Sequence, residues 1–138
     1  PTSLVFDMTE HFDALETRSP ADREAAQMAA LPGQLAHAKQ NSAAFADILR
    51  DIDVSGIDSR AALTRIPVTR KSELFERQKA HRSTDVFGGF STLVRGPRMS
   101  RIFASPGPIY EPEGASRDYW RAGRALFAAV AGAVETVA

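Results

Sequence analysis

Cysteine is absent from the 138 residues, and long apolar runs are missing as well. Without cysteine there can be no disulfide and no thiolate metal ligand, which favours a reducing, cytoplasmic setting. The apolar run Ala125–Val134 is far shorter than the roughly 20 residues that a membrane-spanning helix requires. Residues 1–20 also lack the basic stretch followed by an apolar stretch that opens a secretory signal. We therefore expect a cytoplasmic protein without a membrane partner.

Recognisable catalytic and metal-binding patterns are missing too. His11, His37 and His81 are too far apart in the sequence to share a zinc-ligand spacing. No Gly-x-Ser-x-Gly motif marks a serine nucleophile. Glu111 and Glu113 would lie on the same side of an extended segment, so a coupled carboxylate pair or a cation site is an alternative to two exposed acids. We predict no catalytic residue and no metal ligand from these patterns.

Charge is balanced overall but uneven along the chain. The composition, 43% hydrophobic and 25% charged with a net charge of zero, is typical of a folded globular protein. Residues 1–58 contain ten acidic and four basic side chains, whereas residues 60–82 contain seven basic and two acidic ones. We expect these two segments to attract each other. Nucleic-acid binding is the alternative for the basic segment, which contains Arg60, Arg65, Arg70, Lys71, Arg77, Lys79 and Arg82.

The nucleic-acid alternative has little support in the surrounding sequence. Phe75 is the only aromatic residue of the basic segment, and no zinc-finger or glycine-rich pattern accompanies it. A net charge of zero gives no long-range attraction for a polyanion. We therefore predict a solvated basic face with intramolecular partners, and no nucleic-acid partner.

Helix start signals recur through the first 80 residues. Ser19 followed by proline, Ser42 and Ser59 are all predicted N-caps, because a serine hydroxyl can accept from the free N–H groups of a first turn. Thr69 is predicted to cap a further helix that ends near Ala80. Pro32–Gly33 should kink or restart the first helix, because an interior proline removes one backbone hydrogen bond.

Strand signals are few and lie after residue 87. Gly88–Gly89 and Gly96–Pro97 bracket a short strand at Thr92–Arg95, and Met99–Phe103 is predicted to pair with it as a small hairpin.

Ser116 is predicted to cap the last helix, in which Tyr119 and Trp120 would act as core anchors. The apolar face of this helix comprises Tyr119, Leu126, Phe127, Val130, Val134 and Val137. A face of this width needs a partner, so we expect self-association, with exchange of this helix as one route.

The segment Arg101–Pro112 combines an apolar strand-like start with a loop rich in Ser, Gly and Pro. Such a loop can turn successive backbone N–H groups toward a phosphate. Three prolines in it, Pro106, Pro108 and Pro112, remove three of those donors. A stiff connection between a strand and a helix is therefore the alternative.

Several segments, in order along the chain, resemble the N-terminal region of phenylacetate-CoA ligases, which are members of the adenylate-forming acyl-CoA synthetase superfamily. The residues Ile66–Leu74 resemble the family's Pro-x-Thr-x-Lys-x-Asp/Glu-Leu segment. The other similar stretches are Leu35–Ala38 with Asn41 and Phe45, Phe87–Gly88, and Arg101–Ser105. Together they span roughly residues 20–130 in the family's order.

The resemblance implies that Ser105, Gly107 and Pro112 belong to the loop that holds the phosphates of ATP. That loop is degenerate here, because the family's lysine is replaced by Glu111. A carboxylate repels a phosphate charge by about 1 kcal/mol in water at contact distance. The family uses ATP, Mg²⁺ and coenzyme A, and we expect none of them to bind tightly to this chain alone.

The predicted fold is mainly α with a small β-hairpin, as the N-terminal fragment of an α/β adenylate-forming ligase domain. Residues 1–138 would form a single partial domain, with a helical region at 19–82, a hairpin and phosphate-loop-like segment at 83–112, and a long helix at 116–138. The implied function is that of an N-terminal segment or truncated relative of an ATP-dependent, AMP-forming phenylacetate or aryl-CoA ligase, which is not catalytically competent alone. The resemblance places the acyl, adenine and ribose sites after residue 138, so the remainder of a ligase domain is the other expected partner. The alternative is a non-catalytic helical module that works by self-association or by binding another protein.

Overall fold

A computed structural model describes residues 11–135 as mainly helical, with one small antiparallel sheet. The predicted class, mainly α with a small β-hairpin, is confirmed. In chain order the elements are α1 Pro20–Asn41, α2 Ala43–Ile48, the 3-10 turn η1 Val54–Gly56, α3 Arg60–Leu63, α4 Lys71–His81, β1 Met99–Ser105, β2 Ile109–Gly114 and α5 Gly123–Glu135.

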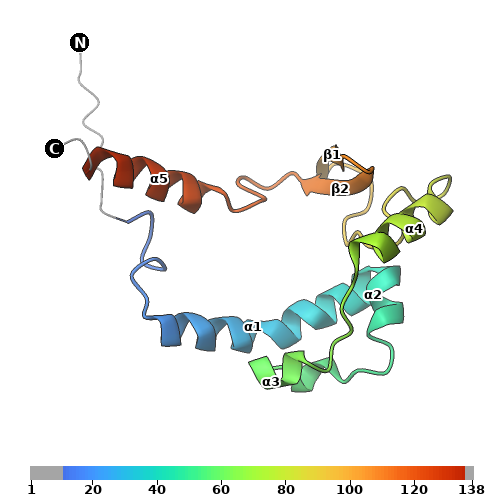
Figure 1. The fold of residues 1–138 in the computed structure, drawn as a ribbon, viewed down its shortest axis with the longest axis horizontal. Helices are drawn as coiled ribbons and strands as arrows, with labels where there is room; N and C mark the ends of the chain where they lie inside the picture. Colours follow the sequence, from blue (N-terminus) through green and yellow to red (C-terminus); the bar gives the residue numbers. More distant parts are fainter. Residues whose placement is uncertain (1–10, 136–138) are drawn as a thin grey trace, which may run out of the picture.

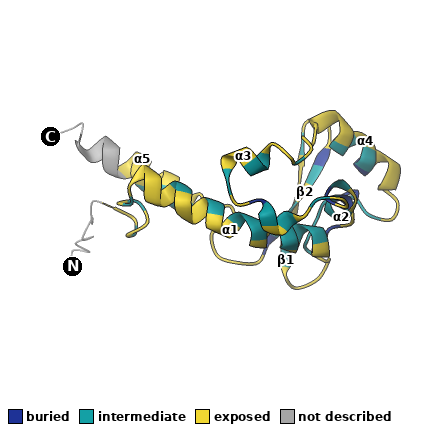
Figure 2. Ribbon diagram, turned by 90° about the horizontal axis from the view of Figure 1, so that it is seen from below, coloured by how far each residue is buried: buried dark blue, intermediate teal, exposed yellow. Residues whose placement is uncertain are grey.

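The molecule is open, with its small core at one end. Helices α1 and α5 lie along opposite sides, while α2, α4 and the hairpin gather at one end (Figure 1). The buried apolar side chains belong to Ala44, Leu49, Ile57, Phe87 and Ile109. Helix α5 is largely exposed over its described part (Figure 2). The candidate site, between α4 and the hairpin, lies at the end of the molecule that has the packed core.

Three of the five predicted N-caps are confirmed. The hydroxyl oxygens of Ser19, Ser42 and Ser59 accept hydrogen bonds from the backbone N–H groups three residues further on, at 3.1–3.2 Å. Thr69 is not a cap, because α4 begins at Lys71 after an extended Arg70. The carboxylate of Glu73 accepts from the Arg70 N–H at 3.2 Å, which fixes the helix start at this position.

Proline inside α1 does not divide the helix. Helix α1 continues through Pro32 to Asn41, so of the two predicted alternatives, a kink or a restart, the restart is wrong. A proline removes one donor, and the intact turns on both sides keep the helix continuous. At its far end Lys39 donates to the carbonyl oxygens of Arg50 and Ile52, each at 3.1 Å, and thereby holds the chain after α2 against α1.

The expected attraction between the acidic and the basic segment is confirmed by two ion pairs. Arg60 pairs with Glu24 of α1, and Arg77 of α4 pairs with Asp47 of α2 at 2.9 Å. The hydrogen bond from Arg77 lowers the pKa of Asp47 below the ordinary aspartate value. The basic segment thus has intramolecular partners in both α1 and α2.

The hairpin is present, but its predicted pairing is wrong. Strand β1 pairs with β2 in antiparallel register, with Ile102 opposite Pro112 and Ser105 opposite Ile109. The segment Thr92–Arg95 is not a strand. There the Ser91 hydroxyl accepts from the Leu93 N–H at 2.9 Å and donates to the Leu93 carbonyl at 2.8 Å. This local turn thus occupies the backbone N–H and carbonyl of Leu93, which a β-strand would use to pair with its neighbour.

The last helix begins later than predicted. Helix α5 starts at Gly123, so Ser116 does not cap it. Asp118 and Arg121 have φ angles of 52° and 53°, which a helix does not allow. The carboxylate of Asp118 accepts from the Gly123 N–H at 3.2 Å instead. The predicted end at residue 138, including Val137, lies outside the described residues.

The aromatic residues before α5 pack on the hairpin rather than within the helix. Trp120 contacts Phe103 edge to face with ring centroids 6.2 Å apart, and its indole N–H donates to Glu113 at 2.9 Å. The prediction that Tyr119 and Trp120 anchor the last helix is therefore wrong. Within residues 11–135, no helix has the length and apolar character needed to cross a membrane.

Helix α5 instead packs on the segment before α1. Phe127 contacts Phe12 with centroids 5.8 Å apart, and Arg124 pairs with Asp13. The hydrogen bond from Arg124 lowers the pKa of Asp13.

Candidate functional site

Gln78 joins the hairpin to α4. Its side chain is 2% exposed. The amide Nε2 donates to the Tyr110 carbonyl at 2.9 Å, and Oε1 accepts from the Tyr110 N–H at 2.8 Å. The side-chain amide thus pairs with β2 as a neighbouring strand would, and it satisfies both backbone groups of Tyr110. This contact fixes where the hairpin lies relative to α4.

A hollow of about 380 Å³ lies beside this contact, between the start of α4 and the hairpin. The residues that line it are Thr69, Arg70, Lys71, Leu74, Ser105, Ile109 and Glu111. They come from two of the segments, 66–74 and 101–112, that were compared with the ligase family. Folding brings these segments together although they are distant in the sequence.

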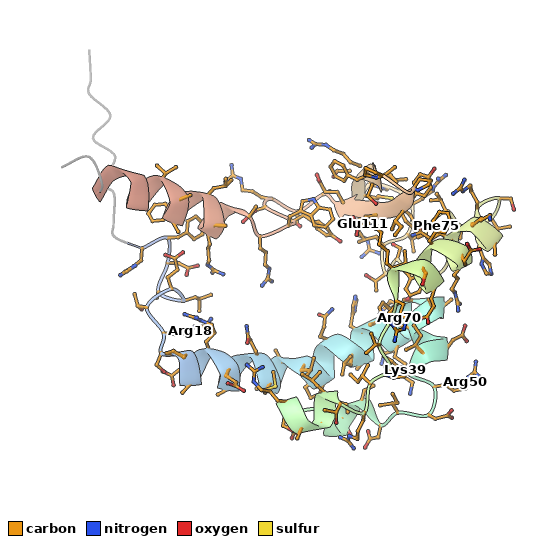
Figure 3. The ribbon with its side chains drawn as sticks, in the orientation of Figure 1. Arg18, Lys39, Arg50, Arg70, Phe75 and Glu111 are labelled. Carbon is orange, nitrogen blue, oxygen red and sulfur yellow. The ribbon has the colours of Figure 1, made fainter. Side chains whose placement is uncertain are left out.

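Charged groups in this hollow have no ion-pair partner among residues 11–135. Arg70, Lys71 and Glu111 are exposed, and none of them forms a salt bridge with another described residue. Figure 3 shows Arg70 at the start of α4 and Glu111 on the hairpin. At the start of α4 the Glu73 carboxylate accepts from the Arg70 N–H at 3.2 Å and places one negative charge at the positive end of the helix. The hollow therefore combines two cations, a helix N-terminus and one carboxylate.

The three predicted site residues do not lie together. Ser105 is half-buried and lines the hollow. Gly107 is at the exposed tip of the hairpin, where its φ of 109° suits glycine. Pro112 lies on β2 and lines a neighbouring hollow of about 300 Å³ with apolar walls that include Phe45 and Phe90. Of the three predicted site residues, Ser105 alone lines the first hollow.

Arg70 and Lys71 were not among the predicted site residues. They belong to the segment Ile66–Leu74, which resembles a segment of the ligase family. That segment is distant in the sequence from the loop segment Arg101–Pro112, so the sequence gave no reason to place these two segments together. The position of Arg70 and Lys71 places two cations in the same hollow as Glu111.

Glu111 and Glu113 have different neighbours and do not form a coupled pair. Glu113 accepts from the Trp120 indole and lies 3.8 Å from the Arg101 guanidinium, whereas Glu111 faces the hollow. Within the part of the chain that the structure describes, no three His, Cys, Asp or Glu side chains are grouped to hold a metal ion.

Comparison with protein-family models, with curated proteins and with solved structures found no match to this chain. The family resemblance therefore rests on the sequence motifs alone.

Proposed function

We propose that this chain is the N-terminal segment, or a shortened relative, of an ATP-dependent, AMP-forming phenylacetate or aryl-CoA ligase, and that the hollow at α4 holds phosphates of the nucleotide. Such a ligase joins a carboxylate to ATP, releases pyrophosphate, and passes the acyl group to the thiol of coenzyme A. The observation that supports the proposal is that both ligase-like segments line one hollow. The reaction uses cytoplasmic substrates, so the proposal also places the protein in the cytoplasm.

The residues of the hollow suit a polyphosphate. Arg70 and Lys71 provide charge, and the Ser105 hydroxyl can donate to a phosphate oxygen. The N–H groups at the start of α4 add donors of the kind that commonly bind anions. Because the cations are exposed and the site covers the phosphates alone, the expected affinity is weak, with a Kd on the order of 1 mM.

Glu111 gives Mg²⁺ a place in the same hollow. Magnesium is usually held by one or two carboxylates together with substrate phosphates, and Glu111 is the one carboxylate in the lining. The same group repels phosphates when no metal is present. Mg²⁺ held by Glu111 would neutralise this repulsion and so favour phosphates in the same hollow.

Binding of ATP and Mg²⁺ measured by calorimetry tests the proposal. We expect Lys71→Gln to weaken binding about tenfold, because one charge-assisted hydrogen bond is lost, and Ser105→Ala to weaken it less. Lys79→Gln is the matched control, since Lys79 is at the other end of α4 and lies beside Glu76. Glu111→Gln should weaken binding with Mg²⁺ and strengthen binding of metal-free ATP. Equal losses in the Lys71 and Lys79 variants, or no saturable binding, would contradict the proposal.

Self-association is the second candidate function, and the surface of α5 favours it. Leu126 and Val130 are 66% and 58% exposed, and a second copy of the same helix would cover them. A stable dimer by light scattering, together with absence of ATP binding, would favour this candidate over the ligase.

A further inference from the structure

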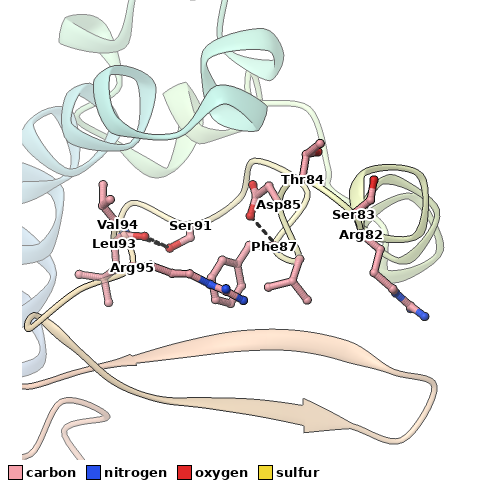
Figure 4. Close-up of a pocket in the computed structure, with 10 residues that line it drawn as sticks. Arg82, Ser83, Thr84, Asp85, Phe87, Ser91, Leu93, Val94 and Arg95 are labelled. Atoms are coloured by element: carbon pink, nitrogen blue, oxygen red, sulfur yellow. Dashed lines mark hydrogen bonds between the residues drawn. The ribbon is translucent and has the colours of Figure 1, made fainter.

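The two outer edges of the hairpin differ in how they are covered. On the edge of β2, the Gln78 side chain bonds both backbone groups of Tyr110, and Pro112 has no N–H to offer. Figure 4 shows α4 and the segment that follows it on the β2 side of the hairpin, with β1 as the strand further from them. Residues 100–104 of β1 are exposed. The edge of β1 is therefore the side of the hairpin that is open to a further strand.

The register identifies the backbone groups that point to this open edge. In an antiparallel pair, residues that bond the partner strand alternate with residues that point both backbone groups away from it. Tyr110 points both groups at Gln78, so Ala104 opposite it also points both groups away from β2. Ile102, opposite Pro112, follows the same alternation. No other described residue outside the hairpin bonds the backbone of Ile102 or Ala104, which leaves two N–H groups and two carbonyls at the open edge.

The edge of β1 carries little protection against strand addition. Natural edge strands are commonly protected by lysine, by proline or by a charge that points into an added strand. Strand β1 contains no lysine and no proline, and its one charged residue, Arg101, lies 3.8 Å from Glu113 of β2. Ile102 and Phe103 are exposed at the same edge, as is Trp120, which packs on Phe103. Free backbone groups and exposed apolar side chains thus lie together.

A second copy of β1 fits this edge in one register. If two copies pair in antiparallel fashion about a two-fold axis at Phe103, Ile102 of each lies opposite Ala104 of the other. Each of these two pairs exchanges two hydrogen bonds, so all the free groups of both residues are used. A register centred on Arg101 would instead set two like charges directly opposite each other, which is unfavourable.

The side chains suit the same register. Arg101 would lie opposite Ser105 of the second copy and keep Glu113 as its ion-pair partner. Phe103 would face its own counterpart, and each of the two rings already has Trp120 beside it. We infer that the edge of β1 is a self-association surface, on which two copies of this chain form one four-stranded sheet with the two β1 strands at its centre.

Sedimentation velocity over a range of concentrations tests this inference. A strand pair of this length is a small interface, so association should be weak and reversible, with a Kd on the order of 0.1–1 mM. Ala104→Pro should raise this Kd at least about tenfold, because it removes the outward N–H in both copies but none of the bonds between β1 and β2. Ala104→Ser is the matched control, since it keeps the N–H and should associate as the native chain does.

A cysteine at the two-fold axis gives a second test that does not need proline to be tolerated. The native chain has no cysteine, so Phe103→Cys introduces a single thiol. Opposite residues of such a pair have Cα atoms about 4.5 Å apart, within the range that a disulfide spans. Mild oxidation should therefore link two copies of Phe103→Cys much faster than two copies of Arg98→Cys, in which the thiol is exposed but outside the paired segment.

Two results would overturn the inference. The first is equal rates of cross-linking in the two cysteine variants, which would indicate random collision. The second is association that Ala104→Pro leaves unchanged and Leu126→Gln abolishes, which would assign the interface to the exposed face of α5. Lys71→Gln, which tests the hollow at α4, should leave association unchanged, so this inference and the proposed ligase function can fail separately.

Discussion

Replacing Gln78 with leucine should lower the free energy of unfolding by about 2–4 kcal/mol, because it leaves two partly buried backbone groups of Tyr110 without partners. In the native chain the Gln78 amide satisfies both the N–H and the carbonyl of Tyr110. Leucine is close to glutamine in size, so the loss comes from hydrogen bonds rather than from a cavity. The same change should loosen the hairpin from α4 and weaken ATP binding at the hollow between them.

Urea denaturation measures this effect. The control is Gln34→Leu, since Gln34 is exposed on α1 and its replacement should change the free energy of unfolding by less than about 0.5 kcal/mol. A Gln78→Leu protein as stable as the Gln34→Leu protein would show that the bonds to Tyr110 do not hold the hairpin in place.

Gly88→Ala should lower the free energy of unfolding by about 2–5 kcal/mol, for two reasons that add. Gly88 has a φ of 61°, a conformation that costs a residue with a Cβ atom about 1–2 kcal/mol. A Cβ placed there would also lie 2.9 Å from the backbone nitrogen of Gln78 and 3.0 Å from the carbonyl carbon of Arg77. Backbone atoms of a helix cannot move aside easily, so overpacking adds about 1–3 kcal/mol.

Gly88→Asn separates these two causes. Asparagine tolerates a positive φ but still carries a Cβ, so it should also destabilise the protein if the contact with α4 matters. Gly33→Ala on α1 is the control, because nothing lies within 4 Å of the added atom and the change should be neutral or stabilising. A well-tolerated Gly88→Asn, measured by the same denaturation, would contradict the close approach to α4.

Local signals in the sequence predicted the helical half of the fold well. Ser19, Ser42 and Ser59 were identified as caps because a cap depends on the residue itself and on the next three positions. The prediction of Thr69 as a cap is wrong because the carboxylate of Glu73 bonds the N–H of Arg70 and so selects a later start for the helix. The error of one residue at the start of α4 thus has a specific competing hydrogen bond as its cause.

The hairpin and the start of α5 depend on contacts that local signals do not contain. Strand β1 pairs with β2 across the Pro-Gly-Pro turn rather than with Thr92–Arg95. The reason is that the Ser91 hydroxyl already bonds the backbone N–H and carbonyl of Leu93. The Tyr119 ring lies against Gly114, where an added Cβ would be 2.6 Å from a ring atom. This packing against the hairpin keeps residues 115–122 out of a helix despite their helical pattern.

The candidate site was predictable only in part. Ser105 was predicted as a site residue because its loop resembles a known motif, and it lines the hollow. Gly107 and Pro112 were predicted from the same motif, but neither of them lines this hollow. Arg70 and Lys71 reach the site because Gln78 sets the hairpin beside α4. A pairing between a side-chain amide and a strand has no sequence signature. The wall of the hollow that contains Arg70 and Lys71 could therefore be identified only from the structure.

Backbone NMR of the labelled protein during titration with ATP and Mg²⁺ tests the central claim, that the two ligase-like segments form one phosphate-binding hollow. The account predicts that amide signals of residues 69–74 and of residues 105–111 shift together, with one common affinity. Shifts confined to one of the two segments, or centred on residues outside both, would contradict it.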